Sequence, residues 1–581
     1  MKNLRTLKKY FLRYKTALIT GIFFIIVSNA FTVYVPIIIK DSLNDLQQGI
    51  AENKLVEYAL LIVGSTLMAG IFRFMIRQTI IVISRKIEYD LRQDFWEYIQ
   101  HLSLRFFQNN STGNIMAHAT NDISAVRMFI GPAVMYSIDT GVRIIIVISI
   151  MSMISWEVTL WSLIPLPFLS FLVYVVGKKV HKRFTLIQEK FADLTTKAQE
   201  NFSGIRVIKS YVAEEREVAE FDRLSREYLA RNMKLVKIQA LFQPTLFLIT
   251  GMSIIIAIWA GGTAVINKTL MIGDVTALIM YLGILIWPMI AFGWVINIIQ
   301  QAEASMARLN KLWSEELEIA DVGEEKSLVT EVKGEVEFRN VSFKYGENLP
   351  FVLQNLNLKI PAGHSLAIMG NTGSGKTTMI NLIPRLFDAT EGEVLLDGVN
   401  IKDISLKTVR RSIGFVPQEA FLFSETIKNN ICYGKPDATE SEITERAKIA
   451  QFSKDVLEFP EGFETVVGER GITLSGGQKQ RASLTRALMT DPEILILDDS
   501  FSAVDTHTEE DILQGLRGFM KNRTTLMVSH RVSTVKDADK IVILDKGMIA
   551  EEGTHDELIK LNGLYAGIYN RQLLEQEIEE I

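Results

Sequence analysis

The sequence is nearly devoid of cysteine and carries no excess of positive charge. Cys432 is the single cysteine among 581 residues, so the chain cannot form an intrachain disulfide, and its chemistry does not depend on a cysteine-ligated metal. The 62 Lys and Arg are outnumbered by 67 Asp and Glu, for a net charge of −5, so no basic field indicates a nucleic-acid partner. These absences exclude a disulfide-stapled secreted domain and argue against a nucleic-acid-binding protein.

Charge is also absent from long stretches in the first half of the chain. Overall, 48% of residues are hydrophobic and 22% are charged, a mixture that indicates two unlike halves. Four stretches without Asp, Glu, Lys or Arg reach the ~20 residues that a helix needs to cross a bilayer. They cover 16–39, 158–177, 238–267 and 275–302. After about Glu325 no such stretch occurs, so the composition excludes both a wholly soluble enzyme and a disordered scaffold.

Two further spans are predicted where charges interrupt apolar runs. One contains Arg73 and Arg77, which could line a cavity for anionic or amphipathic cargo, make packing contacts or snorkel to the interface. The other contains Asp139 and Arg143, whose spacing of four residues predicts an intrahelical pair. The six predicted spans lie at about 16–39, 57–84, 130–156, 158–177, 238–266 and 275–302.

Basic residues predict how these spans are oriented. The first fifteen residues contain six Lys or Arg and no acid, and the apolar stretch that follows is too long for a signal-peptide core, so we expect a retained first span. Basic clusters at 85–86 and 178–183 follow the second and fourth spans and predict cytoplasmic ends there. The long polar connections that begin at these clusters look helical, with breaks near 109–113 and 201–204. The helices would turn at these breaks outside the membrane, and the two tips formed there would be suited to passing movement mechanically between the spans and another part of the protein.

The periodicity changes from Gly334 onward. The segments 336–345 and 356–360 alternate apolar and polar residues, as in a small antiparallel sheet. Short runs of continuous apolar residues follow, which is typical of parallel strands buried on both faces. These runs are 366–369, 413–416, 494–497 and 525–528. Helical stretches separate them, so this half is predicted to be α/β.

The first buried run is followed by a complete G-x-x-x-x-G-K-T sequence. Its glycines let backbone N–H groups surround phosphate oxygens at the start of a helix, Lys376 reaches the β- and γ-phosphates, and the Thr377 hydroxyl binds Mg²⁺. The residues predicted to bind ATP here are Gly370, Asn371, Thr372, Gly373, Ser374, Gly375, Lys376, Thr377 and Thr378.

Polar residues also follow the other three runs. Gln418 follows the second, Asp498 and Asp499 follow the third, and His530 follows the fourth. Alone, Asp498 could cap a helix, Gln418 could be a loop residue and His530 could be structural. Because ligands bind outside the carboxyl ends of strands in open parallel sheets, the four positions together predict one phosphate site.

A further motif indicates a family. Leu474-Ser475-Gly476-Gly477-Gln478 precedes a helix containing Arg481 and resembles the signature of ATP-binding cassette (ABC) proteins. Tyr345 is similar to their adenine-stacking aromatic residue, 502–505 to their D-loop, and 467–471 to the coupling segment of exporters. Six spans ahead of one cassette resemble an ABC exporter half-transporter over nearly the whole chain.

The resemblance implies a fold and a dimer. The expected fold is a membrane all-α six-helix domain at 1–325, followed at 326–581 by an α/β P-loop nucleotide-binding domain with a small antiparallel β-subdomain. Two cassettes would pair head to tail, each ATP lying between one phosphate loop and the partner's signature residues, here Ser475, Gly477 and Gln478. The implied Mg²⁺ ligands are Thr377, Gln418 and Asp498, and the implied catalytic residues are Asp499, His530 and Gln418.

One position departs from the family pattern. The residue after the Mg²⁺-binding aspartate is usually a glutamate that acts as base or positions the attacking water, but here it is Asp499. Aspartate is shorter by one methylene, about 1.5 Å. We therefore expect a site that holds ATP and hydrolyses it slowly, as in the degenerate-site subunit of heterodimeric multidrug-type exporters. The alternative is a homodimer in which Asp499 suffices.

The expected function is ATP-driven export of small hydrophobic or amphipathic molecules across the cytoplasmic membrane. The chain would be a multi-pass protein with both termini and the cassette in the cytoplasm, in contact with membrane lipids and a second half-transporter, without nucleic acid. A lipid or lipid-linked glycan flippase is the near alternative. An ATP-gated channel or regulator is the alternative from another class, which a slow site would tolerate.

Overall fold

The computed structural model describes residues 3–49, 52–468, 474–502 and 504–579. It divides into two compact units, one of Met1–Gln100 with Thr112–Glu315 and the other of His101–Ser111 with Glu316–Ile581. The short segment His101–Ser111 thus belongs with the second unit. The boundary expected after residue 325 stays a prediction.

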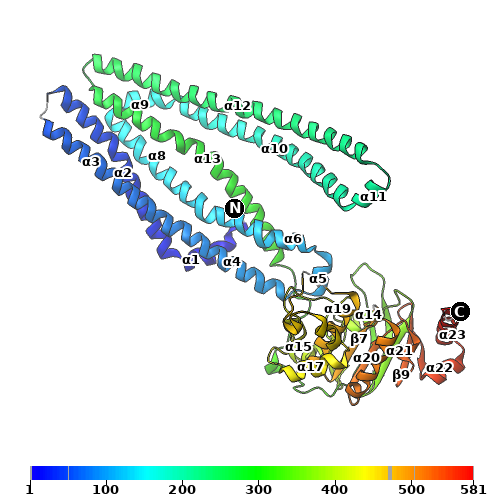
Figure 1. The fold of residues 1–581 in the computed structure, drawn as a ribbon. Coiled ribbons are helices and arrows are strands. Elements are labelled where there is room, and N and C mark those ends of the chain that lie inside the picture. The colour runs from blue at the N-terminus through cyan, green and yellow to red at the C-terminus, as the bar shows by residue number, and fades with distance from the viewer. Residues whose placement is uncertain (1–2, 50–51, 469–473, 503, 580–581) are drawn as a thin grey trace. The chain divides into compact units, whose positions relative to one another are not determined.

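The first unit is built from long helices (Figure 1). Among the described residues six helices are long and apolar enough to cross a membrane, and each overlaps one of the six predicted spans. They are Lys15–Gln47, Asn53–Gln100, Thr112–Ile154, Trp156–Ser203, Glu214–Ile266 and Ile272–Leu312. The prediction of an all-α, six-span membrane half is confirmed.

These helices contain short 3-10 and π-helical segments, so some are divided into several elements. The elements of the first unit are η1 (Asn3–Leu7), α1 (Lys8–Arg13), α2 (Lys15–Gln47), α3 (Glu52–Ile76), η2 (Arg77–Ile81), α4 (Val82–Gln100), α6 (Thr112–Ala117), η3 (His118–Asp122), α7 (Ile123–Met128), η4 (Phe129–Ala133), α8 (Val134–Ile154), α9 (Trp156–Leu163), α10 (Pro165–Ser203), α11 (Ile205–Ser210), α12 (Glu214–Ile266) and α13 (Ile272–Leu312).

The longest helices extend far past any bilayer. The 53 residues of α12 make a rod of about 80 Å at 1.5 Å per residue, against a hydrocarbon core of about 30 Å. In Figure 1, α10 and α12 run side by side to the short helix α11, which turns the chain after Gly204. The first long connection breaks between Asn109 and Thr112. Both breaks fall where the sequence predicts them.

A closed polar network lies among the spans. Arg143 forms the expected pair with Asp139 at 3.0 Å on α8. Asn29 of α2 joins it, since Asn29 Nδ2 donates to Asp139 Oδ1 at 2.9 Å and Asn29 Oδ1 accepts from Arg143 Nε at 2.8 Å. The network ties α2 to α8 and satisfies both charges inside the protein. Arg73 and Arg77 are exposed instead.

The second unit contains a six-stranded and a four-stranded sheet. The larger has the order β10-β9-β3-β8-β7-β6 and is parallel except for β10. Its strands are β3 (Ser365–Gly370), β6 (Ile413–Val416), β7 (Ile494–Asp498), β8 (Thr524–Val528), β9 (Lys540–Asp545) and β10 (Met548–Gly553). The smaller is antiparallel with the order β2-β1-β4-β5. Its strands are β1 (Val336–Phe343), β2 (Leu353–Ile360), β4 (Glu391–Leu396) and β5 (Val399–Asn400).

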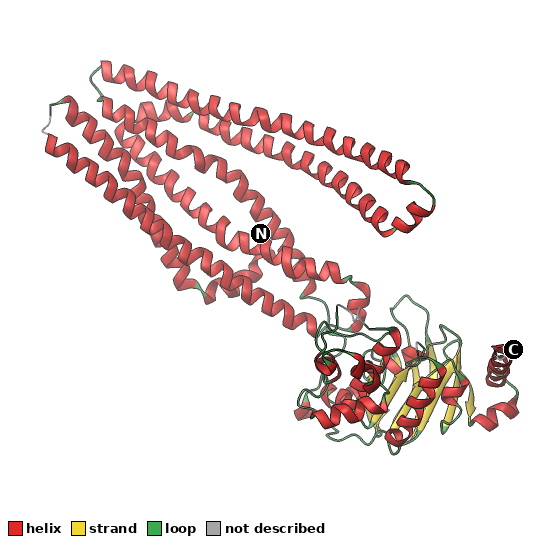
Figure 2. Ribbon diagram, in the orientation of Figure 1, coloured by secondary structure: helices red, strands yellow, loops and turns green. Residues whose placement is uncertain are grey.

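Helices surround these strands, as Figure 2 shows. The helices of this unit are α5 (Leu104–Asn109), η5 (Glu324–Lys326), α14 (Lys376–Asn381), η6 (Ile401–Asp403), α15 (Leu406–Arg411), α16 (Ile427–Ile431), α17 (Glu440–Ile449), α18 (Ser453–Glu458), η7 (Gly462–Glu464), α19 (Gly476–Met489), α20 (Thr506–Met520), α21 (Val532–Val535), α22 (His555–Leu561) and α23 (Leu564–Glu579). The predicted α/β cassette with a small antiparallel sheet is confirmed.

Both faces of the larger sheet are buried, which explains the unalternating apolar runs. In β7, Ile494 and Ile496 belong to one hydrophobic core, and Leu495 and Leu497 belong to the other. A strand between two apolar cores needs apolar side chains at every position. The four runs that the sequence marks out are β3, β6, β7 and β8.

Candidate functional site

Four adjacent parallel strands bring the candidate residues to one edge of the sheet. The spatial order β3-β8-β7-β6 places the phosphate loop after β3, His530 after β8, Asp498 and Asp499 at the end of β7, and Gln418 after β6. Because the strands are parallel, their carboxyl ends share an edge. Although β8 is the last of these four strands in the sequence, it lies directly beside β3 in the sheet. His530, which follows β8, therefore lies just past the end of the strand next to the one that leads into the phosphate loop.

The phosphate loop curls around its own lysine. Lys376 Nζ donates to the backbone oxygens of Gly370 and Asn371, each at 2.9 Å. Gly370 has φ +144°, and a Cβ there would lie 2.2 Å from the Leu544 oxygen. Gly375 has φ +102° where α14 begins. Only glycine fits these two positions, so the loop's tight backbone follows directly from the motif.

Two groups in the loop fit a phosphate. Burial lowers the pKa of Lys376, while the charges of Asp499 and Asp498 partly oppose that effect. The buried Ser374 Oγ has no hydrogen-bond partner within the described residues. An ammonium bonded only to carbonyls and an unpaired buried hydroxyl would both gain from anionic oxygens. The loop therefore fits a nucleotide phosphate chain.

The donors beside the loop fit Mg²⁺. Thr377 Oγ1 donates to Asp498 Oδ1 at 3.2 Å. Burial raises the pKa of Asp498, and Asp499 adds to this, while Thr377 and Lys376 oppose it. A cation would relieve that buried charge, and hydroxyl and carboxylate oxygens are the ligands that Mg²⁺ prefers. Gln418 is exposed past β6, and the structure shows no bond joining it to this pair in the part of the chain described.

Asp499 occupies the turn that leaves β7. Its φ of +45° is left-handed, a conformation that aspartate and asparagine adopt more readily than other non-glycine residues. Its N–H donates to the Val528 oxygen at 2.9 Å, and its own oxygen accepts from the Ser502 N–H at 3.3 Å. These bonds fix the backbone of the candidate base. In the following D-loop, Ala503 lies outside the described residues.

Tyr345 lies beside the first turn of α14. Its hydroxyl is 2.9 Å from Thr378 Oγ1, and its ring meets Phe343 and Phe387 edge to face. The structure thus brings the expected adenine-stacking residue next to the phosphate loop. Its stacking role stays a prediction.

The signature residues begin α19. The Ser475 N–H donates to Gln478 Oε1 at 2.9 Å, and Ser475 Oγ accepts the Gln478 N–H at 3.2 Å. This capping box leaves the hydroxyl hydrogen of Ser475 able to donate to an anion. Gly477 lies in the same first turn, at the positive end of the helix dipole. In the preceding coupling segment, residues 469–471 lie outside the described residues.

A carboxylate that the sequence does not single out supports this motif. Asp455 on α18 accepts two hydrogen bonds from Arg481 and one from Gln478 Nε2 at 3.3 Å. The bond to Gln478 turns that amide so that its oxygen faces Ser475. No short motif links residues 455 and 478, so only the fold reveals this contact.

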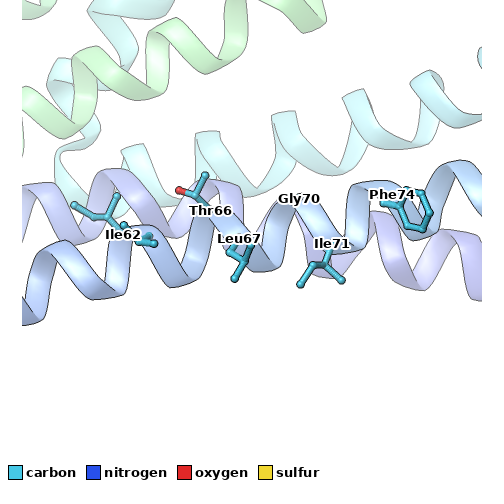
Figure 3. Close-up of a pocket in the computed structure, with 7 residues that line it drawn as sticks. Ile62, Thr66, Leu67, Gly70, Ile71 and Phe74 are labelled. Atoms are coloured by element: carbon cyan, nitrogen blue, oxygen red, sulfur yellow. The ribbon is translucent and has the colours of Figure 1, made fainter.

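A separate apolar groove lies on α3 (Figure 3). It has a volume of about 710 Å³ and is lined by residues of α3 alone, with Thr66 as the single hydroxyl. The lining residues are Ile62, Val63, Thr66, Leu67, Gly70, Ile71 and Phe74. Such a surface suits hydrocarbon chains and offers no group for catalysis.

Comparisons with known proteins agree with this geometry. Residues 18–289 match the family described as ABC transporter transmembrane region, and residues 353–502 match the family described as ABC transporter. The chain is 38% identical to the probable multidrug resistance ABC transporter ATP-binding/permease protein YheI of Bacillus subtilis, over 98% of this chain and 96% of that protein. It is 34% identical to an ATP-dependent lipid A-core flippase of Desulfotalea psychrophila, over 98% of this chain and 100% of the relative.

A solved structure extends the likeness to three dimensions. The structure of a bacterial Atm1-family ABC exporter with ATP bound aligns with a TM-score of 0.81 at 27% identity, covering 96% of this chain and 99% of that chain.

Proposed function

This chain belongs to the ABC transporter family as a half-transporter that fuses a membrane region to an ATP-binding cassette, and we propose that it exports hydrophobic or amphipathic molecules as one subunit of a heterodimer. The cassette implies ATP binding and ATPase activity, and exporters of this family work as dimers. The proposal goes further in naming the cargo class, the cytoplasmic membrane and an unequal pair of ATP sites.

The observation behind the unequal sites is Asp499 at the end of β7. Its carboxylate reaches about 1.5 Å less far than the usual glutamate. Its backbone is held by Val528 and Ser502, so little backbone movement is available to make up the difference. Loss of a positioned base costs on the order of 10²–10⁴ in rate. The phosphate loop is complete, so ATP binding survives while hydrolysis slows.

The remaining residues take the roles that their positions favour. Lys376 and the loop amides hold the phosphates, Tyr345 stacks on adenine, and His530 contacts the γ-phosphate. Thr377, Asp498 and Gln418 would hold Mg²⁺, which when bound would neutralise charge on the phosphate oxygens. Ser475, Gly477 and Gln478 act in the partner's site, where they complete a fast ATPase.

The exposed tip of the helical hairpin formed by α10 and α12 is an argument for a second subunit. Around α11 at its tip, Phe202, Tyr211 and Val212 are 77%, 80% and 82% exposed. Three large apolar side chains gathered on one tip mark a surface that another protein covers. The first tip, His101–Ser111, belongs to the unit that holds this chain's own cassette. We therefore assign the second tip to the partner's cassette.

A lipid flippase remains the second candidate for one reason, the 34% identity to the lipid A-core flippase. Arg143 gives it no help, because Asn29 and Asp139 already satisfy its guanidinium. ATPase stimulated by lipid, with no drug transport in vesicles, would favour the flippase.

The decisive experiment compares ATP turnover of the chain alone with that of Asp499→Glu. We expect weak activity in the wild type and a rise of about 10- to 100-fold in the variant, because the longer side chain restores the positioned base. Asp499→Asn is the matched control and should not exceed the wild type. Robust wild-type turnover with no gain in the glutamate variant contradicts the slow site. Purification from the native membrane, without a second six-span cassette chain, contradicts the heterodimer.

A further inference from the structure

A side chain of the C-terminal helix α23 forms hydrogen bonds with the backbone on both sides of Arg531. Gln572 Nε2 on α23 donates to the His530 oxygen at 2.6 Å, and Gln572 Oε1 accepts the Val532 N–H at 2.8 Å. A carbonyl needs a donor and an N–H needs an acceptor, so only one orientation of the amide satisfies both. One side chain thus spans the turn that presents His530.

The same turn is held from α20. The buried Glu509 accepts hydrogen bonds from Arg531 and from Thr534 Oγ1, the latter at 2.5 Å. The Arg531 N–H donates to Ser529 Oγ at 3.0 Å. The backbone at His530 and Val532 is therefore held from α23, and the side chains of Arg531 and Thr534 are held from α20.

His530 itself differs from its surroundings. Its side chain is exposed, whereas Ser529 before it is buried. The backbone sets where an exposed side chain begins and which of its staggered rotamers are allowed. The contacts that fix the backbone therefore limit the directions in which the imidazole can point.

The helix that carries Gln572 is firmly anchored. Tyr565 is fully buried, and its hydroxyl is 2.6 Å from His555 Nδ1. The N–H groups of Leu564 and Tyr565 both donate to the carboxylate of Glu551, the latter at 3.0 Å. Gln572 lies about two helical turns beyond Tyr565. The helix that places Gln572 against the His530 backbone is thus anchored in the cassette core.

We propose that Gln572 is a positioning residue for ATP hydrolysis, which holds the His530 backbone so that the imidazole meets the γ-phosphate. The inference rests on the proposed role of His530. Gln572 does not touch the nucleotide, so it affects turnover and leaves ATP affinity unchanged. The C-terminal helix is then part of the catalytic apparatus.

The test replaces the amide while keeping its shape. Gln572→Glu puts a carboxylate oxygen against the His530 oxygen, and Gln572→Ala removes the grip. The matched control is Asn570→Asp, the same chemical change at an exposed position of the same helix. ATPase is measured on the full chain alone, in the wild-type and Asp499→Glu backgrounds, because in the pair the proposed fast site of the partner would dominate turnover. We expect kcat to fall about tenfold in both Gln572 variants, with KM for ATP within about twofold, and no change in the control.

A second readout does not depend on turnover. Hydrogen exchange of the amides at 529–535 should accelerate in both Gln572 variants and stay unchanged in the control. Gln572→Ala removes the acceptor of the Val532 N–H, and the carboxylate of Gln572→Glu is repelled by the His530 oxygen. Faster exchange with unchanged kcat would overturn the positioning role, as would an equal loss of kcat and ATP affinity. If Asp499→Glu gains nothing, the slow-site proposal fails, while kcat in the wild-type background and the exchange rates still decide the role of Gln572.

Discussion

The guanidinium of Arg481 donates two parallel hydrogen bonds of 2.8 Å to the carboxylate of Asp455. Each side chain is only 13% exposed, so this is a partly desolvated bidentate pair and not a surface contact. It fixes α19 against α18 close to the turn that holds Ser475. Fork-to-fork pairs set direction as well as distance, so the pair orients the first turn of α19.

Loss of that pair should harm the partner's ATP site. Asp455→Asn keeps the shape but cannot accept both guanidinium bonds, and we expect ATPase of the assembled dimer to fall about 5- to 20-fold. Labelling of this chain's own site with a photoreactive ATP should persist, because its phosphate loop is untouched. Glu458→Gln, at an exposed position of the same helix, is the control. Equal loss of labelling at both sites would point to general unfolding instead.

The polar network among the spans predicts that mutations of Asp139 and Arg143 have non-additive effects on thermal stability. Arg143→Gln leaves the partly buried Asp139 carboxylate without its charge partner and should lower the thermal stability, because removing one partner of a desolvated ion pair is destabilising. The double variant Asp139→Asn with Arg143→Gln removes both charges and should recover most of the thermal stability in lipid nanodiscs. Substrate-stimulated ATPase should recover with it. If stability recovers while stimulation stays lost, Arg143 contacts cargo.

The tip of the long hairpin can be probed by cross-linking. Cys432 is buried, so Tyr211→Cys adds a single accessible thiol to the chain. With a bifunctional thiol reagent, this cysteine should join the two subunits when an exposed cysteine is placed on the partner's cassette. Val218→Cys, also exposed but beyond the tip, should react poorly. Cross-links confined to a single chain would contradict the assignment of the second tip to the partner.

One acidic group should make the cassette sensitive to low pH. The ammonium of Lys435 at 2.7 Å, with the backbone and hydroxyl of Thr439, lowers the pKa of Glu442 from 4.5 to about 2. A depressed pKa means that the contribution is present above about pH 4.5 and is lost as pH falls toward 2. Glu442→Gln should lower the melting temperature by about 1–3 °C at pH 7, with the difference closing between pH 4.5 and 2.5. Glu461→Gln, exposed and away from Lys435, should show no such pH-dependent difference.

Much of the fold follows from local pattern. Charge-free apolar length predicts four of the six spans, and the other two follow once a few charges within apolar runs are allowed. Unalternating runs such as 494–497 predict the buried strands, because a strand between two cores has no polar face. The backbone conformation of the loop from Gly370 to Thr377 depends on its own glycines, so the sequence also predicts where the phosphate loop lies.

Contacts across the chain are a different matter. Asn29 meets Arg143 across 114 positions, and Gln572 meets His530 across 42. Asn29 and Gln572 belong to no sequence motif. An asparagine or glutamine that bonds to a distant part of the chain needs no particular residues next to it in the sequence. These contacts depend on helix packing, which residue spacing does not encode.

The left-handed backbone at Asp499 has a consequence for the proposed unequal pair of ATP sites. At that φ, an aspartate relaxes a turn that a glutamate would hold under slightly more strain. If the partner's site carries the fast turnover, as proposed, aspartate relieves backbone strain at this turn without slowing the transport cycle.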